Sequence, residues 1–131
     1  MKTELLYLVL TTVLTGLLWI PYIINRAAVR GVHDAMGYPA NPKPQAPWAD
    51  RLQKAHYNAV ENLVLFAALV LTAHAIGLSD PAIGTAAVVY FWARVVHAAV
   101  YTFAIPWLRT LSWTVGWLAL AVIADLSPTS R

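Results

Sequence analysis

The chain has no cysteine among its 131 residues, and only 11% of its residues are charged. Without cysteine there is no disulfide framework, no thiolate metal site and no cysteine nucleophile. A soluble domain has about 25% charged residues, so this chain has too few charges to cover a soluble surface. Its nine basic residues form no continuous basic stripe, and a nucleic-acid partner is therefore not expected.

Hydrophobic residues, by contrast, make up 60% of the sequence, whereas a soluble domain has about 45–50%. A membrane-spanning helix needs about 20 mostly apolar residues, and the chain is long enough for four such helices with short connections. We therefore predict an all-α integral membrane protein that folds as a single four-helix bundle over residues 1–131. The predicted spans are residues 5–25, 55–78, 82–105 and 109–126, with a cytoplasmic loop at 26–54.

Proline and glycine indicate where the helices stop and start. The segment GYPANPKPQAPWAD contains four prolines and a glycine, so a continuous helix is not expected there. Pro81 suits the first turn of the third helix. Pro21 is expected to kink the first span, because proline removes a backbone hydrogen bond from a helix interior. The first connection is therefore predicted to be long, and the other two short.

The basic residues predict the orientation in the membrane, because lysine and arginine are in excess on the cytoplasmic side. The first and third connections are basic, and the second has no basic residue. Both termini are therefore expected on the non-cytoplasmic side and the functional site toward the cytoplasm, in the inner membrane if the source is bacterial. The basic residues concerned are Arg26, Arg30, Lys43, Arg51, Lys54 and Arg109.

Polar residues form a row on each of two predicted spans, because they recur at intervals of three and four residues and so share a helix face. The second span carries Arg51, Lys54, Asn58 and Glu61, and the third carries Tyr90, Arg94, His97 and Tyr101. In antiparallel helices, Glu61 and Arg94 reach a similar depth, about 15 Å from the cytoplasmic end at 1.5 Å per residue. We therefore predict an ion pair between these two side chains.

Two interpretations of that pair stay open. It can fix the register of the helices, as polar groups between membrane helices do. It can also belong to a binding pocket, since charged groups inside a membrane usually face a bundle interior or a cavity. The further polar residues on the same side favour a pocket with excess positive charge, which suits an anionic ligand. These residues are Lys54, Asn58, His97, Tyr101 and Arg109.

Three segments, RLQKAHYNAVEN, RVVHAAVY and IPWLRT, together resemble the MAPEG family of membrane-associated proteins in eicosanoid and glutathione metabolism. The resemblance covers nearly the whole chain. It implies a homotrimer that binds glutathione in clefts between subunits, with contacts from Asn58, Glu61, Arg94 and Tyr101. Arg26 matches the position of a glutathione-binding arginine at the end of the first helix. The remaining expected contacts come from Arg51, Lys54 and His97.

The resemblance also implies a reaction, in which a glutathione thiolate attacks a lipophilic electrophile or hydroperoxide that arrives from the bilayer. Arg109 resembles the arginine beside the thiol in the leukotriene and prostaglandin enzymes of the family. Tyr101 and Thr110 are the other candidate catalytic residues. The interval from Tyr101 to Arg109 is one residue shorter than in the prostaglandin enzyme, and Thr110 replaces a serine. No metal is expected, since the histidines form no zinc motif.

Two other functions fit the same residues. One is a non-catalytic relative that binds a thiol or a lipid without turnover, because contact residues can persist without chemistry. The other is a small four-span drug transporter, which would use a membrane glutamate to exchange protons for cations. The predicted partnership of Glu61 with Arg94 weighs against a cationic drug. Activity with glutathione would separate the enzyme from both.

Overall fold

The structure, a computed structural model, describes residues 1–129 of the chain; residues 130 and 131 of the predicted domain lie outside the described residues. The described residues contain helices and no strand. The helices are α1 (Thr3–Leu17), α2 (Trp19–Arg30), α3 (Val32–Met36), α4 (Pro47–Ala75), α5 (Pro81–Thr102) and α6 (Pro106–Thr129). Four stretches are long and apolar enough to cross a membrane: Thr3–Arg30, Pro47–Ala75, Pro81–Thr102 and Pro106–Ser127. The all-α, four-span prediction is confirmed.

The first span is interrupted at Leu18, between α1 and α2. Pro21 explains the position of the break, since it has no backbone N–H to donate to the carbonyl four residues earlier, at Leu17. The helix then continues to Arg30 and stops at Gly31, whose φ of 80° favours glycine. The span is thus interrupted close to Pro21, and it extends beyond the predicted end at residue 25.

The predicted loop over residues 26–54 is much shorter in the structure. Residues up to Arg30 belong to α2, α3 lies within the connection, and α4 already begins at Pro47. The apolar run starts later than the helix does, because proline favours a first turn and charged residues continue a helix outside the apolar region. In that first part of α4, Lys54 Nζ lies 3.3 Å from Asp50 Oδ2, four residues away.

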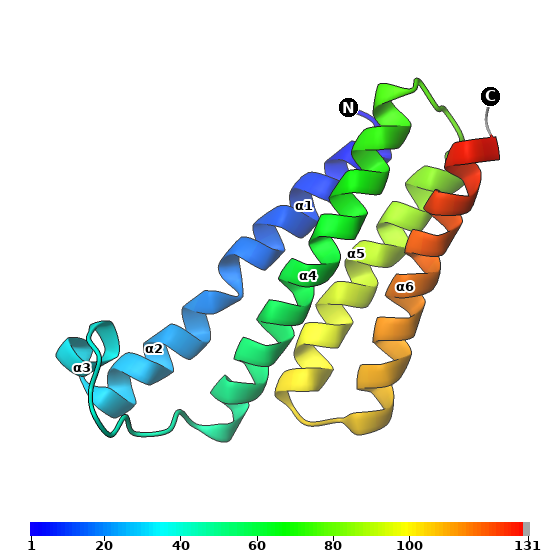
Figure 1. Ribbon diagram of the computed structural model, residues 1–131. Coiled ribbons are helices and arrows are strands. Elements are labelled where there is room, and N and C mark those ends of the chain that lie inside the picture. Colours follow the sequence, from blue (N-terminus) through cyan, green and yellow to red (C-terminus); the bar gives the residue numbers. More distant parts are fainter. Residues whose placement is uncertain (130–131) are drawn as a thin grey trace.

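The other helix ends differ from the predicted ones by a few residues. Helix α5 begins at Pro81 and ends at Thr102, where the prediction ran to 105, and α6 begins at Pro106 instead of 109. The start of α5 is capped by Asp80, whose carboxylate accepts a hydrogen bond from the Ala82 N–H at 2.9 Å. Both termini lie at one end of the bundle, and the α2–α4 and α5–α6 connections lie at the other (Figure 1).

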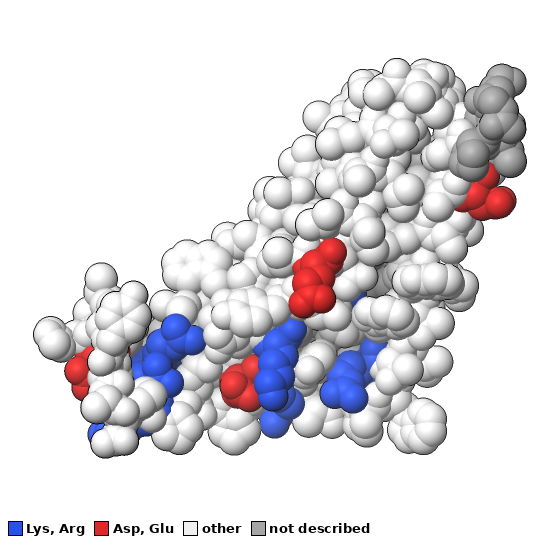
Figure 2. All heavy atoms as spheres, in the orientation of Figure 1, with Lys and Arg blue, Asp and Glu red and all other residues white. Residues whose placement is uncertain are grey.

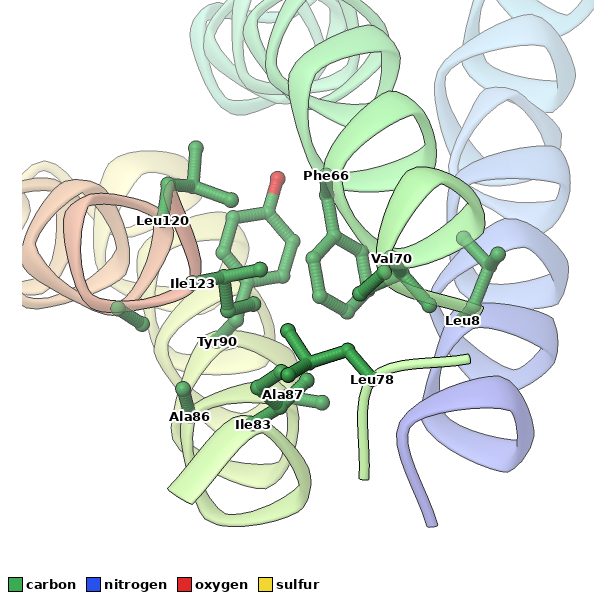
Figure 3. Packing of buried hydrophobic residues seen from close by; sticks show 12 residues of the cluster. Leu8, Phe66, Val70, Leu78, Ile83, Ala86, Ala87, Tyr90, Leu120 and Ile123 are labelled. Carbon is green, nitrogen blue, oxygen red and sulfur yellow. The ribbon is translucent and has the colours of Figure 1, made fainter. Parts of the chain in front are cut away.

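Helix α5 is the most buried of the four spans and packs against α1, α4 and α6. It contributes more buried residues to the apolar core than any other helix, and in that core the rings of Phe66 and Tyr90 stack with centroids 4.2 Å apart. Ile83 of α5 and Ile123 of α6 are fully buried beside them (Figure 3). This packing fixes α5 against its neighbours along one half of the bundle and leaves its other half to carry polar residues.

The outer surface of the bundle is apolar, as a bilayer requires. Large hydrophobic side chains such as Val64, Leu111 and Trp107 are exposed, Trp107 to 81%. With four spans of this kind the chain is an integral, multi-pass membrane protein. On the face shown in Figure 2, Lys and Arg gather at the end of the molecule that carries the α2–α4 and α5–α6 connections.

Candidate functional site

Arg94 lies in the middle of α5 with only 3% of its surface exposed. Its Nη2 donates a hydrogen bond to the Asn58 Oδ1 at 2.8 Å and lies 3.3 Å from His97 Nδ1. Its Nε is buried and has no hydrogen-bond partner among the described residues. None of the ion pairs among these residues includes Arg94. This guanidinium is therefore a buried cation without a counter-ion among residues 1–129.

The predicted ion pair between Glu61 and Arg94 is wrong for the single chain. Glu61 is exposed, and the ion pairs of the described residues are Lys54 with Asp50 and His33 with Asp34. The reason is angular: Glu61 lies six residues after the fully buried Ala55, which turns it about 120° away from the buried face of α4 at 100° per residue. Asn58 is turned less far and takes the place beside Arg94.

A hollow of about 220 Å³ lies at the basic end of the bundle. Five of the ten residues predicted to bind or catalyse line it, although they come from three separate helices. Its lining contains cationic and hydrogen-bonding groups and no carboxylate. The lining residues are Asn58, His97, Tyr101, Arg109, Thr110 and Trp113. Arg94 lies behind this wall and reaches it through its contacts with Asn58 and His97.

The aromatic ring of Tyr101 is held between two of these groups. The Arg109 Cζ lies 5.0 Å from the centroid of the Tyr101 ring, within the range of a cation–π contact. The His97 and Tyr101 rings also meet edge to face, with their centroids 5.5 Å apart. Arg109 itself is exposed, so its charged group is accessible from outside the bundle.

The tight turn between α5 and α6 brings Arg109 back over Tyr101. The Ile105 N–H donates to the Val100 carbonyl at 2.9 Å, and the Ala104 N–H donates to the Tyr101 carbonyl at 3.2 Å. Ala104 has a φ of 59°, a left-handed conformation that costs a residue with a Cβ roughly 1–2 kcal/mol. Pro106 then starts α6 at once. The segment IPWLRT therefore positions the arginine through backbone geometry.

The remaining predicted residues lie outside this hollow. Arg26 donates to the Gln45 and Gln53 side-chain oxygens, each at 3.3 Å. Arg51 Nε donates to the Thr102 carbonyl at 2.9 Å, and so joins the start of α4 to the end of α5. Lys54 and Glu61 are exposed on the outer face of α4. None of these four residues lines the hollow.

One residue that lines the hollow was not among the site residues predicted from the sequence. Trp113 lines the hollow, and its place three residues after Thr110 on a helix was the available signal. Tyr90 was part of the polar row on α5, but its buried hydroxyl group has no partner among the described residues. Among those residues, no group of three His, Cys, Asp or Glu side chains is placed to hold a metal ion.

Comparison with known proteins identifies one family. The model of the MAPEG family matches residues 5–126, which is nearly the whole chain. A comparison with individual curated proteins gave no significant match. The family match includes every residue that lines the hollow.

Proposed function

This chain belongs to the MAPEG family, and from that premise we propose that it is a membrane transferase or peroxidase that uses glutathione as its co-substrate. The family supports a role in membrane-associated glutathione or eicosanoid metabolism. The choice of glutathione and of this chemistry rests on the cationic hollow. Its substrate would be a lipophilic electrophile or hydroperoxide dissolved in the bilayer.

The observation that carries this proposal is the buried charge of Arg94. An unpaired charge inside a protein is costly, and its Nε has an unused donor. A guanidinium binds a carboxylate in bidentate fashion, through a planar pair of N–H groups. Glutathione is an anion with two carboxylates, one ammonium and a thiol, so one of its carboxylates can supply the missing counter-ion near Arg94.

The size of the hollow supports a site shared between copies of the chain. About 220 Å³ is less than the roughly 300–1,000 Å³ of a typical small-molecule site, so the single chain encloses only part of a tripeptide. Glu61 lies fourteen residues after Pro47 and fourteen before Ala75, at the midpoint of α4, and is exposed there. A charge at the centre of the bilayer costs roughly 2.5–3.5 kcal/mol, and Glu61 lies within the apolar part of α4. A homotrimer with Glu61 in a cleft between subunits removes that cost.

In such a cleft the exposed residues acquire roles. Glu61 accepts the ammonium of glutathione, and the half-buried Arg26 and Arg51 contribute further positive charge with Lys54. Native mass spectrometry of the protein in mild detergent should then show three copies of the chain. A stable monomer that binds glutathione would contradict the shared site. Glutathione would then bind to the cationic hollow of a single chain.

Arg109 is placed to stabilise the reactive thiolate. A free thiol has a pKa of about 8.5, which a nearby cation lowers. The Arg109 guanidinium lies over Tyr101 and beside Thr110, so the cation and two hydroxyl groups can converge on one sulfur. The thiolate then attacks the electrophile, a sulfur–carbon bond forms, and the leaving group departs with its electron pair.

The same thiolate also accounts for a peroxidase reaction. It attacks one oxygen of the hydroperoxide, the O–O bond breaks, and an alcohol leaves after it takes up a proton. The sulfenic acid of glutathione that forms reacts with a second glutathione to give the disulfide and water. The electrons come from the two thiols, so no metal is needed. Both reactions require the same site residues: Tyr101, Arg109 and Thr110.

The drug-transporter alternative requires a new argument, because the Glu61–Arg94 pair that weighed against it is absent. Membership of the MAPEG family now weighs against it. The hollow also carries the guanidinium of Arg109 and no carboxylate, which disfavours a cationic cargo. A non-catalytic relative would keep the buried Arg94 and bind glutathione, but it would form no thiolate.

Measurement of the ultraviolet thiolate band at neutral pH, together with glutathione binding and conjugation to a model aryl halide, tests the proposal. We expect Arg109→Ala to retain much of the affinity and to lose the thiolate band and the conjugation rate. Arg30→Ala is the matched control, because Arg30 bonds to the Lys43 carbonyl at the same end of the bundle, outside the hollow.

Tyr101→Phe identifies which group holds the thiolate. If the band falls in Tyr101→Phe and persists in Arg109→Ala, the tyrosine hydroxyl carries that role. Wild-type protein that binds glutathione without a thiolate band would favour the non-catalytic relative. Wild-type protein that binds no glutathione would overturn the proposal.

A further inference from the structure

A second hollow, of about 360 Å³, lies at the opposite end of the bundle, where α1 and α5 begin. Its wall includes the carboxylate residues Glu4 and Asp80 and the hydroxyl residues Thr3, Ser79 and Thr85. It shares no lining residue with the cationic hollow. The proposed glutathione chemistry makes no use of it, so its function is a separate question.

Glu4 is the unusual member of this wall. It is only 8% exposed, and within the described part of the chain it forms no ion pair. Asp80 is occupied, because its carboxylate accepts the Ala82 N–H at 2.9 Å. Lys2 lines the same hollow, but its Nζ donates to the Leu78 carbonyl at 3.3 Å. The carboxylate of Glu4 is thus left for a cation from outside the chain.

An apolar groove adjoins this hollow. Thr85 lines both, and the groove, of about 460 Å³, runs between α5 and α6 past Val89, Val115 and Val122. A ligand that occupies both spaces needs a cationic head and a hydrocarbon chain. The hollow lies at the ends of membrane-spanning helices, where lipid headgroups meet hydrocarbon. The chemistry therefore matches a membrane lipid with a positively charged headgroup.

We propose that this end of the protein binds a phospholipid with a primary ammonium headgroup, such as phosphatidylethanolamine. The ammonium donates one N–H to the Glu4 carboxylate, and two of the three hydroxyl groups accept its two remaining N–H groups. Lys2 lies on the same wall and offsets the charge of the phosphate. One acyl chain follows the groove between α5 and α6. A primary ammonium fits better than a trimethylammonium, which has no N–H to donate.

A comparison of lipids on the wild-type protein tests the headgroup. The full chain in mild detergent is mixed with phosphatidylethanolamine or phosphatidylcholine of identical chains, and bound lipid is counted by native mass spectrometry. We expect about tenfold tighter binding of phosphatidylethanolamine, since a hydrogen bond between charged groups is worth roughly that factor. Equal retention of the two lipids would overturn the proposal, and this result does not depend on any variant.

Two variants then locate the site. Glu4→Gln keeps the shape of the side chain and removes its charge, so the preference for phosphatidylethanolamine should fall about tenfold. Asp34→Asn removes one exposed carboxylate of α3, at the other end of the bundle (Figure 1), and should keep the preference. An unchanged preference in Glu4→Gln, or an equal loss in Asp34→Asn, would contradict a site at Glu4.

A soluble amine distinguishes the headgroup site from the groove. Glycerophosphoethanolamine has the same headgroup without chains, and at equal concentration it should leave bound phosphatidylethanolamine in place. If it displaces the lipid, the ammonium site remains and the role of the groove is overturned. Glutathione binding is measured in the same samples and should be the same in Glu4→Gln and wild type, so failure of one proposal does not decide the other.

Discussion

Helices α4 and α5 carry similar rows of polar residues and place them in opposite environments. On α5, Tyr90, Arg94 and His97 are each buried to 97% or more. On α4, Lys54 and Glu61 are exposed. The difference arises because α5 is the most buried span, packed against α1, α4 and α6, whereas the face of α4 that carries Lys54 and Glu61 is turned away from the helices described around it. Polar spacing thus identifies a face, and the neighbours of the helix decide whether that face is internal.

The largest expected effect follows from changing the buried row. Arg94→Leu should weaken glutathione binding by roughly 3 kcal/mol, the upper end for a hydrogen bond to a charged group. The unliganded protein should keep its stability or gain some, because replacing a buried charge by an apolar residue is often neutral or stabilising. Calorimetry of glutathione binding and thermal unfolding in detergent measure the two quantities. A large loss of stability with unchanged affinity would show that Arg94 is structural.

A smaller loss of affinity is expected when the exposed row is changed. Glu61→Leu should weaken glutathione binding by about 1.5 kcal/mol, since the ammonium loses a charged acceptor. If Glu61 instead faces lipid, the same change should leave the affinity unaltered and raise the stability by roughly 2.5–3.5 kcal/mol. Binding and unfolding measurements on one preparation separate the two environments. Asp34→Leu, at an exposed carboxylate away from α4, is the control.

Glycine substitutions compare the packing on two sides of α5. A Cβ at Gly116 would lie 3.7 Å from the Ala93 Cβ, an ordinary contact, whereas one at Gly84 would lie 3.3 Å from the Thr3 Cβ. Gly116→Ala should therefore stabilise the protein by roughly 0.5–1 kcal/mol through its helix propensity. Gly84→Ala should gain less or lose stability. Thermal unfolding of both variants measures the change in stability. An equal gain in both would show that α1 shifts to make room for the new methyl group at residue 84.

The smallest expected effect is the coupling between the two rows. Glu61→Gln and Arg94→Gln should change the stability of the unliganded protein independently, with a coupling below about 0.5 kcal/mol, because sites without shared partners are additive. Asn58→Ala with Arg94→Gln should be clearly coupled, since these side chains hydrogen-bond at 2.8 Å. Double-mutant cycles measure both values. A coupling of several kcal/mol for the first pair would place Glu61 against Arg94 after all, across a subunit boundary.

The sequence was sufficient for the number of spans and for most of the residues that gather at the hollow. His97, Tyr101, Arg109 and Thr110 are all close to the α5–α6 turn along the chain, so a short connection brings them together in any antiparallel pair. Asn58 comes from another helix, but its helical register with the apolar face of α4 fixes its direction. Trp113 lies three residues after Thr110 on α6, so it shares the helix face of Thr110.

The helix bounds and the partner of Arg94 were harder to predict from the sequence. Hydrophobicity reports where a chain enters lipid, whereas a helix begins where its backbone hydrogen bonds begin, and in α4 these positions are eight residues apart, at 55 and Pro47. Equal depth suggested Glu61 as the partner of Arg94. Depth gives one coordinate of a residue on a helix, and the rotation of α4 about its axis, which packing sets, gives the other.

By itself, the amino-acid sequence determined a four-span, all-helical membrane protein, because apolar runs of that length have no other stable arrangement in a bilayer. It also determined two polar rows and the proline that breaks the first span. Only the tertiary structure decided that Arg94 meets Asn58 and His97, that Glu61 faces outward, and that Glu4 is buried without an ion pair among the described residues. These facts depend on how each helix is rotated against its neighbours, and that rotation is set by the summed packing of many side chains on several helices.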